Sequence, residues 1–330
     1  MAKVSILVPI YGVEKFIERC AISLFEQTFD DIEYIFVNDQ SKDKSIEILE
    51  NVILRYPNRN KNIKIINHIV NKGLAGARNT GIANATGDYI LHIDSDDYIE
   101  LNTIELLYNK AINDNADIVV CNFFLEWSHT QKKVIQSFNG NVNIFIENIL
   151  AGKIVTSVWN KLIKRSLYVD NNIHAIEGVN LGEDFVTIPK LIYYSQKISK
   201  VSDCLYHYVQ INANSYTKKI SDKNIENLVS VYSELEIFFK NTPNSKDFLS
   251  SMRKSKLIKK IELLLRSNRE NFDKIVNLFP DTDNIQNVNF LNGRDKIVFY
   301  LMKRKSNTAL KGYINLYSNL FLLIQKIKGR

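Results

Sequence analysis

Three carboxylates that could do chemistry follow an apolar stretch of the sequence. Residues 89–93 carry four apolar side chains in five positions, and Asp94, Asp96 and Asp97 come next. Such a stretch is typical of a strand buried on both faces, and burying a carboxylate is costly unless it is paired or binds a cation, so we expect the acids at the strand's open carboxyl end. Asp94 and Asp96 point to the same side of an extended chain and could together chelate a divalent cation that also holds a diphosphate. The alternative is a solvated acidic turn that caps a helix beginning near Leu101.

The elements that would position this turn alternate along the first 121 residues. Apolar patterns predict helices between strands at residues 3–9, 32–37, 63–66, 89–93 and 117–121. We expect the first strand to end at Pro9, which cannot continue a ladder, and Ser41 to cap the helix that follows the second strand. Strands that alternate with helices predict an α/β fold with a mostly parallel sheet covered on both faces.

Three sets of polar or aromatic side chains follow the ends of these strands. Pro9 and Tyr11 end the first strand, Asp39 follows the second, and the acidic turn at 94–97 follows the fourth. Ligands of parallel sheets bind beyond the carboxyl ends of the strands. This convergence favours a shared binding site over a simple acidic cap.

Beyond residue 122 the alternation breaks down. The sequence predicts a hairpin of residues 123–127 and 133–138, and strands near 198–201 and 205–209. Gly182, Glu183 and Asp184 precede another helix. From about residue 222 the pattern becomes helical, with apolar stripes at 257–265 and in a last helix at about 308–327.

Length and composition describe an ordinary globular protein. The chain has 330 residues, 45% of them hydrophobic and 24% charged, which is enough for one large domain or two moderate ones. No apolar run approaches the ~18 to 20 residues that a membrane span needs, and the N-terminus lacks a signal-peptide pattern. The three cysteines form no metal-binding pair. We therefore expect a cytoplasmic protein with reduced, buried thiols.

The net charge of +7 is unevenly placed. Residues 221–330 hold 20 Lys and Arg against 11 Asp and Glu, whereas residues 1–220 hold 23 against 25. We expect two domains, 1–220 and a basic, mostly helical region at 221–330. Its apolar stripes could pack on the first domain or on a second copy in a homodimer, or attach to an anionic membrane at its inner face. Nucleic acid is not an expected partner, because no binding motif accompanies the charge.

Five segments together carry a family resemblance. In order, they are residues 4–11, 37–41, 71–79, 93–97 and 182–184. They resemble the inverting family 2 glycosyltransferases of the GT-A fold, over roughly residues 3–215. The resemblance implies a Rossmann-like, mostly parallel sheet flanked by helices in a catalytic domain at 1–220. It also implies metal-dependent transfer of a sugar from a nucleotide sugar, with UDP-sugars expected, to a hydroxyl of a glycan or lipid-linked glycan, as in surface or capsular polysaccharide synthesis.

The resemblance also implies a donor site. Asp39 would accept from the uracil N–H, and Asp94 and Asp96 would bind Mn²⁺ or Mg²⁺, with Asp94 also reaching the ribose. The other implied donor contacts are Pro9, Tyr11 and Glu14 to the nucleoside, Lys72 and Arg78 to the diphosphate, and Ser95. Tyr11 could instead be a packed turn aromatic, and Arg78 a structural salt bridge to Asp94 or Asp96. The chain departs from the family pattern at Gly12, Asn38 and Gln40, so the base identity stays open.

On the acceptor side, Asp184 matches the general base that inversion requires. Glu183 would orient Asp184 or bind acceptor, although the pair could simply favour the helix dipole. Trp159 and Lys161 match an acceptor-side segment, and His207 an additional metal or diphosphate contact. A core tryptophan and a satisfied core histidine are the alternatives. Asp97 would cap the next helix, and Asn214 and Ser215 would close over the donor.

Two other classes compete. A sugar nucleotidyltransferase would need a glycine-rich, basic loop directly after the first strand, and residues 9–14 have neither charge pattern nor glycine run. A non-catalytic nucleotide- or glycan-binding module would not need both a pair of metal-binding carboxylates and a general base. Dinucleotide oxidoreductases and P-loop proteins are excluded, since GxGxxG and GxxxxGK[ST] are absent.

Overall fold

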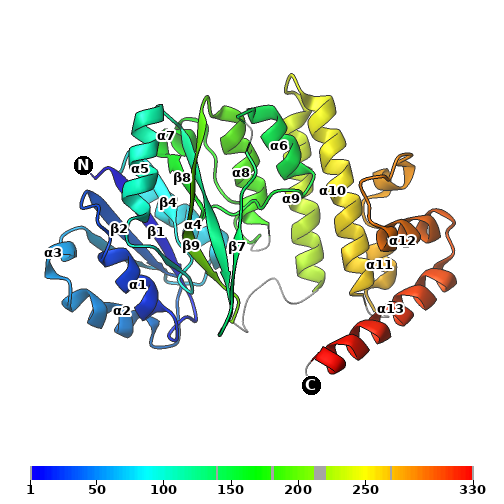
Figure 1. The fold of residues 1–330 in the computed structure, drawn as a ribbon, viewed down its shortest axis with the longest axis horizontal. Coiled ribbons are helices and arrows are strands. Elements are labelled where there is room, and N and C mark those ends of the chain that lie inside the picture. The colour runs from blue at the N-terminus through cyan, green and yellow to red at the C-terminus, as the bar shows by residue number, and fades with distance from the viewer. Residues whose placement is uncertain (1, 139, 180–181, 212–220, 268–269, 329–330) are drawn as a thin grey trace. The chain divides into compact units, whose positions relative to one another are not determined.

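The computed structural model describes residues 2–138, 140–179, 182–211, 221–267 and 270–328. The chain divides into two compact units, one of residues 1–149 with 153–218 and one of residues 150–152 with 219–330 (Figure 1). The expected turn at Asn214 and Ser215 lies outside the described residues.

The first unit is built on one mixed sheet whose strand order is β3-β2-β1-β4-β8-β6-β9-β5, with β7 paired to β6. Strands β3, β2, β1 and β4 are parallel, β8 reverses direction between β4 and β6, and β9 is again parallel to β6. The strands are β1 Val4–Ile10, β2 Ile32–Asn38, β3 Ile63–Asn67, β4 Tyr89–His92, β5 Tyr98–Ile99, β6 Ile118–Glu126, β7 Gln131–Val134, β8 Lys161–Lys164 and β9 Ile198–Val209.

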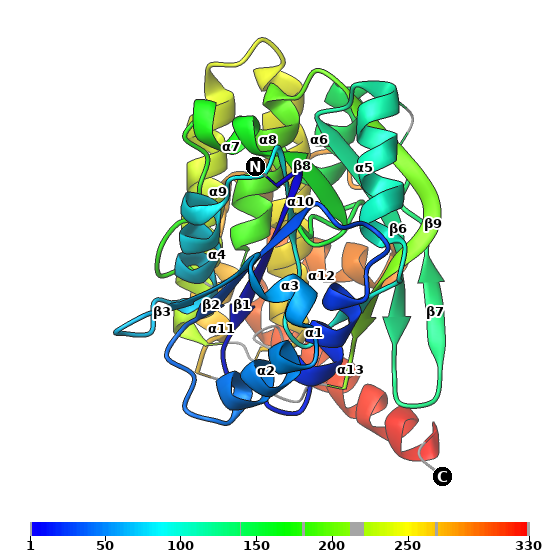
Figure 2. The same ribbon diagram turned by 90° about the vertical axis from the view of Figure 1, so that its left-hand side faces the viewer.

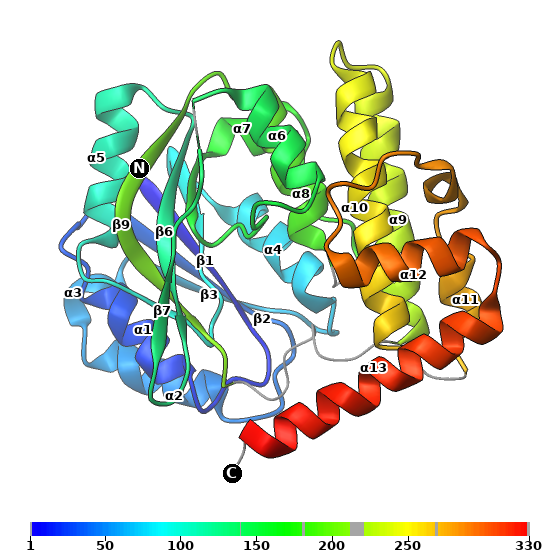
Figure 3. The same cartoon turned by 45° about the vertical axis from the view of Figure 1, so that its right-hand side comes forward.

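Helices cover both faces of this sheet, as the sequence predicts (Figures 2 and 3). Helices α1 and α2 share a core with the even-numbered side chains of β1, and α4 packs on β1 and β2 from the other face. Gly81 of α4 lies close against β1, because a Cβ there would lie 3.3 Å from the Leu7 side chain. The helices are α1 Ile17–Phe25, α2 Ser45–Leu54, α3 Pro57–Asn60, α4 Gly73–Asn84, α5 Thr103–Asp114, α6 Val142–Leu150, α7 Arg165–Asp170 and α8 Glu183–Tyr194.

Two local predictions about the first strands are wrong. β1 runs through Pro9 to Ile10, because pairing with β4 ends at Leu7 and His92, and the missing N–H of Pro9 falls on that unpaired side. Ser41 does not cap α2. The Asp43 carboxylate accepts from the Ser45 N–H at the start of that helix instead, and Ser41 donates its hydroxyl to Asp43.

Later predictions hold with changed boundaries. The hairpin is confirmed as β6 paired with β7, and β6 extends well past the expected strand at 117–121. The two strands expected at 198–201 and 205–209 are one strand, β9, with an irregular register opposite Cys121–Phe123. β8 is a strand that the sequence did not predict.

The second unit is helical, as predicted. Its core joins the apolar stripe of α10 to side chains of α12 and α13. Lys256 and Lys260 of α10 are buried and pair with acids, Lys256 with Glu236 and Lys260 with Asp283. These two basic residues are therefore structural. Its elements are α9 Asp222–Lys240, α10 Ser245–Leu265, α11 Phe272–Val276, η2 Pro280–Asn284, α12 Gly293–Lys303 and α13 Asn307–Lys328. Within the described ranges, no helix is both long and apolar enough to span a bilayer.

Candidate active site

The acidic turn after β4 is partly buried at the carboxyl edge of the parallel strands. Asp94 and Asp96 are half-buried, and Asp97 is fully buried. The Asp97 carboxylate accepts from the Tyr206 hydroxyl at 2.7 Å and from the Val209 N–H at 2.8 Å. Asp97 therefore ties the turn to β9 and does not cap α5, which corrects the prediction. Burial, followed by the neighbouring charges of Asp96 and Asp94, raises the pKa of Asp97 well above its usual range.

Arg78 of α4 joins this turn to the Glu183–Asp184 pair. Its guanidinium is 4% exposed and places Nη2 3.0 Å from Asp94 Oδ1 and 3.6 Å from Glu183 Oε1. Its Nε lies 3.7 Å from Asp184 Oδ1. The salt bridge with Asp94 that the sequence left open is present. One buried cation thus holds together two acidic motifs that lie about ninety residues apart in the chain.

The two acids at the start of α8 both have raised pKa values. Burial and then the adjacent charge of Asp184 raise the pKa of Glu183 to about 8. Burial also raises the pKa of Asp184, although the positive charge of Arg78 acts in the opposite direction. The Val158 N–H donates to Asp184 Oδ2 at 3.1 Å and fixes that carboxyl group. A carboxylate with a raised pKa is a stronger base, which is what deprotonating a hydroxyl requires.

Asp39 is the most tightly held of the predicted donor residues. Its carboxylate accepts from the backbone N–H groups of Lys72 and Gly73 at the start of α4, at 2.7 and 2.8 Å. His68 Nδ1 lies 2.7 Å from Oδ1, and the Asn71 side chain donates to the Asp39 carbonyl oxygen. The ends of β2 and β3 and the first turn of α4 therefore meet at this one side chain.

The first loop lies at the same edge. Tyr11 is 49% exposed, which argues against the packed alternative for its ring. Pro9 is buried within β1. The Glu14 carboxylate accepts from the Lys44 N–H at 3.1 Å, so it faces the start of α2. Lys72 is exposed at the first turn of α4, where a cation could reach a phosphate, whereas Ser95 is buried.

Three predicted contacts are packed inside the first unit. Trp159 is buried and stacks on Tyr206 with ring centroids 4.2 Å apart. His207 stacks on Tyr98 and Phe124, and both of its ring nitrogens lie within 2.9 Å of carboxylates, of Glu126 and Glu100. The structure therefore favours the packed alternatives for Trp159 and His207.

Lys161 is also fully buried. Its Nζ donates to the Ser157 carbonyl oxygen and to Asn160 Oδ1 at 2.6 and 2.7 Å, and burial lowers its pKa to about 8. A buried ammonium with these internal acceptors is placed to stiffen the start of β8. It is poorly placed to meet a large acceptor.

The donor set for a metal consists of Asp94 and Asp96. In the part of the chain that the structure describes, no group of three or more His, Cys, Asp or Glu side chains is arranged to hold a metal ion. Mg²⁺ and Mn²⁺ prefer oxygen ligands, and Mg²⁺ is commonly held by one or two carboxylates together with substrate phosphates. The half-buried pair fits an ion that binds jointly with a diphosphate.

Two residues that contact this site, His68 and Tyr206, carry no prediction from the sequence. His68 directly follows β3, so the strand-end argument that found Asp39 could have found it as well. Tyr206 comes from β9, a strand far along the chain, and no sequence signal connects it with Asp97.

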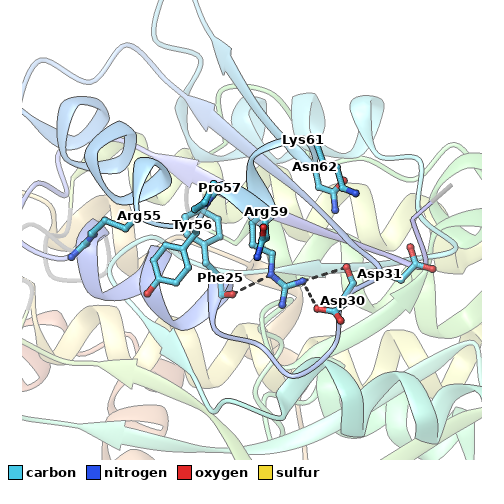
Figure 4. Close-up of a pocket in the computed structure, with 10 residues that line it drawn as sticks. Phe25, Asp30, Asp31, Arg55, Tyr56, Pro57, Arg59, Lys61 and Asn62 are labelled. Carbon is cyan, nitrogen blue, oxygen red and sulfur yellow. Dashed lines mark hydrogen bonds and ion pairs between the residues drawn. The ribbon is translucent and has the colours of Figure 1, made fainter.

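A surface depression of about 770 Å³ is lined by residues that do not belong to the predicted site; Figure 4 shows this lining. Its lining includes Asp30, Asp31, Lys61 and Asn62, which immediately precede β2 and β3. It therefore opens at the amino edge of the parallel strands. Arg59 fills part of it and is held by the carbonyl oxygens of Phe25 and Gln27 and by Asp30. This depression is not part of the predicted site.

Sequence comparison finds a matching family and similar proteins. Residues 5–168 match the family described as Glycosyl transferase family 2. The chain is 34% identical over 222 residues to "Uncharacterized glycosyltransferase EpsJ" and 34% identical over 236 residues to "Putative glycosyltransferase EpsH", both of Bacillus subtilis (strain 168). These alignments cover 65% and 69% of this chain, and the chain spans 63% and 67% of those two relatives.

A solved structure shares the fold. The S. aureus TarS fragment 1–349 in complex with UDP-GlcNAc superposes with a TM-score of 0.72 and 18% identity, covering 96% of this chain and 92% of that one. At this identity the likeness concerns the fold alone. It confirms the predicted GT-A type of architecture.

Proposed function

This chain belongs to glycosyl transferase family 2, and from that premise we propose that it is an inverting glycosyltransferase. It moves a sugar from a nucleotide sugar, with UDP as the leaving group, to a hydroxyl of a glycan or lipid-linked glycan. Support for UDP comes from the buried Asp39 carboxylate, which suits the uracil N–H, and from TarS, which was solved with UDP-GlcNAc. The domain that does this is residues 1–220.

The observation that carries the proposal is the Arg78 junction. Inversion needs a base that faces the acceptor and, opposite it, a site that stabilises the leaving diphosphate. Arg78 lies 3.0 Å from Asp94, on the predicted diphosphate side, and 3.7 Å from Asp184, the predicted base. Two groups that the reaction needs close to one substrate are therefore held by one side chain.

The chemistry follows from these positions. Asp184 accepts the proton of the acceptor hydroxyl while that oxygen attacks the anomeric carbon, and the bond from this carbon to the diphosphate oxygen breaks. Asp94 and Asp96 would hold Mn²⁺ or Mg²⁺, which supplies charge neutralisation for the leaving diphosphate. Arg78 keeps Asp94 and Asp184 in place, and Glu183, with its raised pKa, donates to or orients groups on the acceptor side.

The decisive experiment screens a panel of UDP-, GDP- and CDP-sugars with the full chain and measures nucleotide release with Mn²⁺, with Mg²⁺ and with chelator. We expect metal-dependent release of free UDP and its loss in Asp96→Ala. A parallel reaction contains a nucleoside triphosphate and a sugar 1-phosphate, and release of pyrophosphate from it would indicate a sugar nucleotidyltransferase. Metal-dependent UDP binding without turnover of any donor would indicate a binding module.

The partner of the basic C-terminal unit is a separate part of the proposal. Eight Lys and Arg but no Asp or Glu lie from Lys296 onward. Lys256 and Lys260 pair with acids inside this unit, and peripheral attachment to an anionic inner membrane surface is proposed for the last helix. Sedimentation with anionic and neutral vesicles tests this proposal, because absence of binding to anionic vesicles rejects attachment.

A further inference from the structure

The Asp39 carboxylate, which is expected to bind the nucleobase, interacts with a histidine that is not among the predicted site residues. His68 Nδ1 lies 2.7 Å from Asp39 Oδ1, and His68 Nε2 lies 2.9 Å from the hydroxyl oxygen of Thr80 on α4. The His68 and Asp39 side chains are 6% and 4% exposed. Because both bonds are shielded from water, their geometry constrains the carboxylate more than surface contacts would.

The contacts determine where the protons are. The Asp39 carboxylate already accepts from two backbone N–H groups at the start of α4, where the helix dipole favours negative charge. An ionised carboxylate can only accept, so His68 Nδ1 must carry the proton of their bond. In a neutral imidazole Nε2 is then bare and accepts the Thr80 hydroxyl proton. Thr80 therefore donates to His68, and His68 donates to Asp39, so both hydrogen bonds of this chain point toward Asp39.

The same contacts leave room for one ligand donor. Asp39 Oδ1 accepts from His68 and from the Lys72 N–H, and Oδ2 accepts from the Gly73 N–H. A carboxylate has about four acceptor positions, so one position on Oδ2 stays available. Together with the two backbone N–H groups, the His68 side chain holds the plane of the carboxylate and thereby the direction of that position.

We propose that His68 is a positioning residue for base selection. By helping to orient the Asp39 carboxylate, and with it the remaining acceptor position, His68 favours a nucleotide whose nucleobase offers a ring N–H, such as uracil, over cytosine, whose corresponding nitrogen is itself an acceptor. With cytosine, the ring nitrogen and the Asp39 carboxylate are two acceptors that face each other, so neither receives a hydrogen bond and binding free energy is lost. The inference rests on the proposed function, because Asp39 meets a base only if this edge binds a nucleotide.

A matched pair of substitutions tests it. The amide nitrogen of Asn overlaps the position of Nδ1 and that of Gln the position of Nε2, so His68→Asn keeps the donor to Asp39 and His68→Gln loses it. In titration calorimetry with the full chain, we expect His68→Gln to weaken UDP binding about tenfold and CDP binding little. His68→Asn should stay within about threefold of the parent. With donor sugar, KM should rise in His68→Gln while kcat is kept.

The outcomes separate this inference from the function beneath it. Unchanged UDP binding in His68→Gln overturns the inference, and so does an equal loss for UDP and CDP, which would mark a structural role. Asp39→Asn is the reference. If that variant binds UDP like the parent, the base site of the proposed function fails. If it loses UDP and His68→Gln does not, only the role of His68 fails.

A second measurement needs no variant that could misfold. Nitrogen-15 NMR of the histidine rings reports which ring nitrogen carries hydrogen. A protonated Nδ1 at His68 supports the proposal, and a bare Nδ1 overturns it, because Asp39 would then receive no proton from the ring.

Discussion

The two edges of the parallel strands treat buried acids in opposite ways. At the amino edge Glu33 accepts from the Ser5 hydroxyl, from the Thr86 N–H and hydroxyl and from the Gly87 N–H, and Lys64 lies 3.3 Å away. Burial alone would raise its pKa, but these donors together hold the pKa of Glu33 below its ordinary value. At the carboxyl edge, burial dominates and the pKa values of Glu183 and Asp184 are raised.

Buried polar atoms without a hydrogen-bond partner also differ between the two edges. Among the described residues, five buried side-chain atoms lack a hydrogen-bond partner, and three of them belong to Arg78 and Asp184. None belongs to Glu33. A protein commonly satisfies buried polar groups except where they act on a substrate. This difference supports a division of roles in which the amino edge contributes stability and the carboxyl edge keeps polar atoms available for the proposed ligand.

The largest expected effect is on catalysis by the carboxyl edge. Asp184→Asn keeps the shape and removes the base, so kcat should fall about 10³-fold, within the range for loss of a general base. UDP release in the presence of acceptor measures it, and the urea unfolding midpoint should not fall, because a buried charge is removed. Activity above a tenth of the parent's would show that Asp184 is structural and would contradict the proposed difference between the two edges.

Arg78→Met should damage both activity and stability. It leaves Asp94, Glu183 and Asp184 without their shared cation, and breaking a buried ion pair costs about 3 kcal/mol. We expect the free energy of unfolding to fall by that amount and UDP release to be lost. Arg78→Lys is the matched control, which keeps the charge and should recover stability better than activity, because a lysine lacks the planar fork. Equal recovery of both would contradict a positioning role.

Glu33→Gln tests the amino edge alone. The amide oxygen of Gln can keep the Ser5, Thr86 and Gly87 bonds, which all end on Oε1. The negative charge is lost, however, and the NH₂ group faces the Lys64 ammonium in place of Oε2, so we expect the free energy of unfolding to fall by about 2 kcal/mol. Initial rates measured well below the unfolding temperature should stay within about twofold of the parent. If activity fell as strongly as in Asp184→Asn, the two edges would not be separable.

The smallest effect expected is on the pH dependence of stability. The pKa of Glu33 is lowered from 4.5, so its contribution is present above pH 4.5 and is lost as the pH falls through its folded pKa. The pKa of Glu183 is raised from 4.5 to about 8, so its contribution is full below pH 4.5 and is lost as the pH rises to about 8. Urea unfolding of Glu183→Gln between pH 5 and 8 should show a flatter decline than the parent. An unchanged slope would contradict the raised pKa.

Much of the fold could be predicted because it depends on local pattern. Apolar runs separated by helical periods identify β1 to β4. The salt bridge between Arg78 and Asp94, which the sequence offered as one of two readings of Arg78, is present. The reversal at β8 could not be predicted. It is a four-residue strand that begins and ends with lysine, and its place between β4 and β6 depends on partners from distant parts of the chain.

The roles of individual side chains divide in the same way. Residue type shows that Asp97, Trp159 and His207 are capable of capping, stacking or ligation. Their actual neighbours, Tyr206 for the first two and Glu100 and Glu126 for the third, come from segments more than forty residues away. A side chain forms its hydrogen bonds with the groups that lie beside it in the folded protein, and the order of the sequence does not show which groups these are.

By itself, the sequence determined the family, the α/β architecture and the carboxylates available for chemistry, because each is written in residue type and short-range spacing. Only the tertiary structure decided how these carboxylates differ. It surrounds Glu33 with donors, places Asp184 beside the buried Arg78 guanidinium and gives Asp39 a histidine partner. The physical reason is that a buried charge has the properties of its surroundings, and those surroundings are assembled from distant segments only when the chain folds.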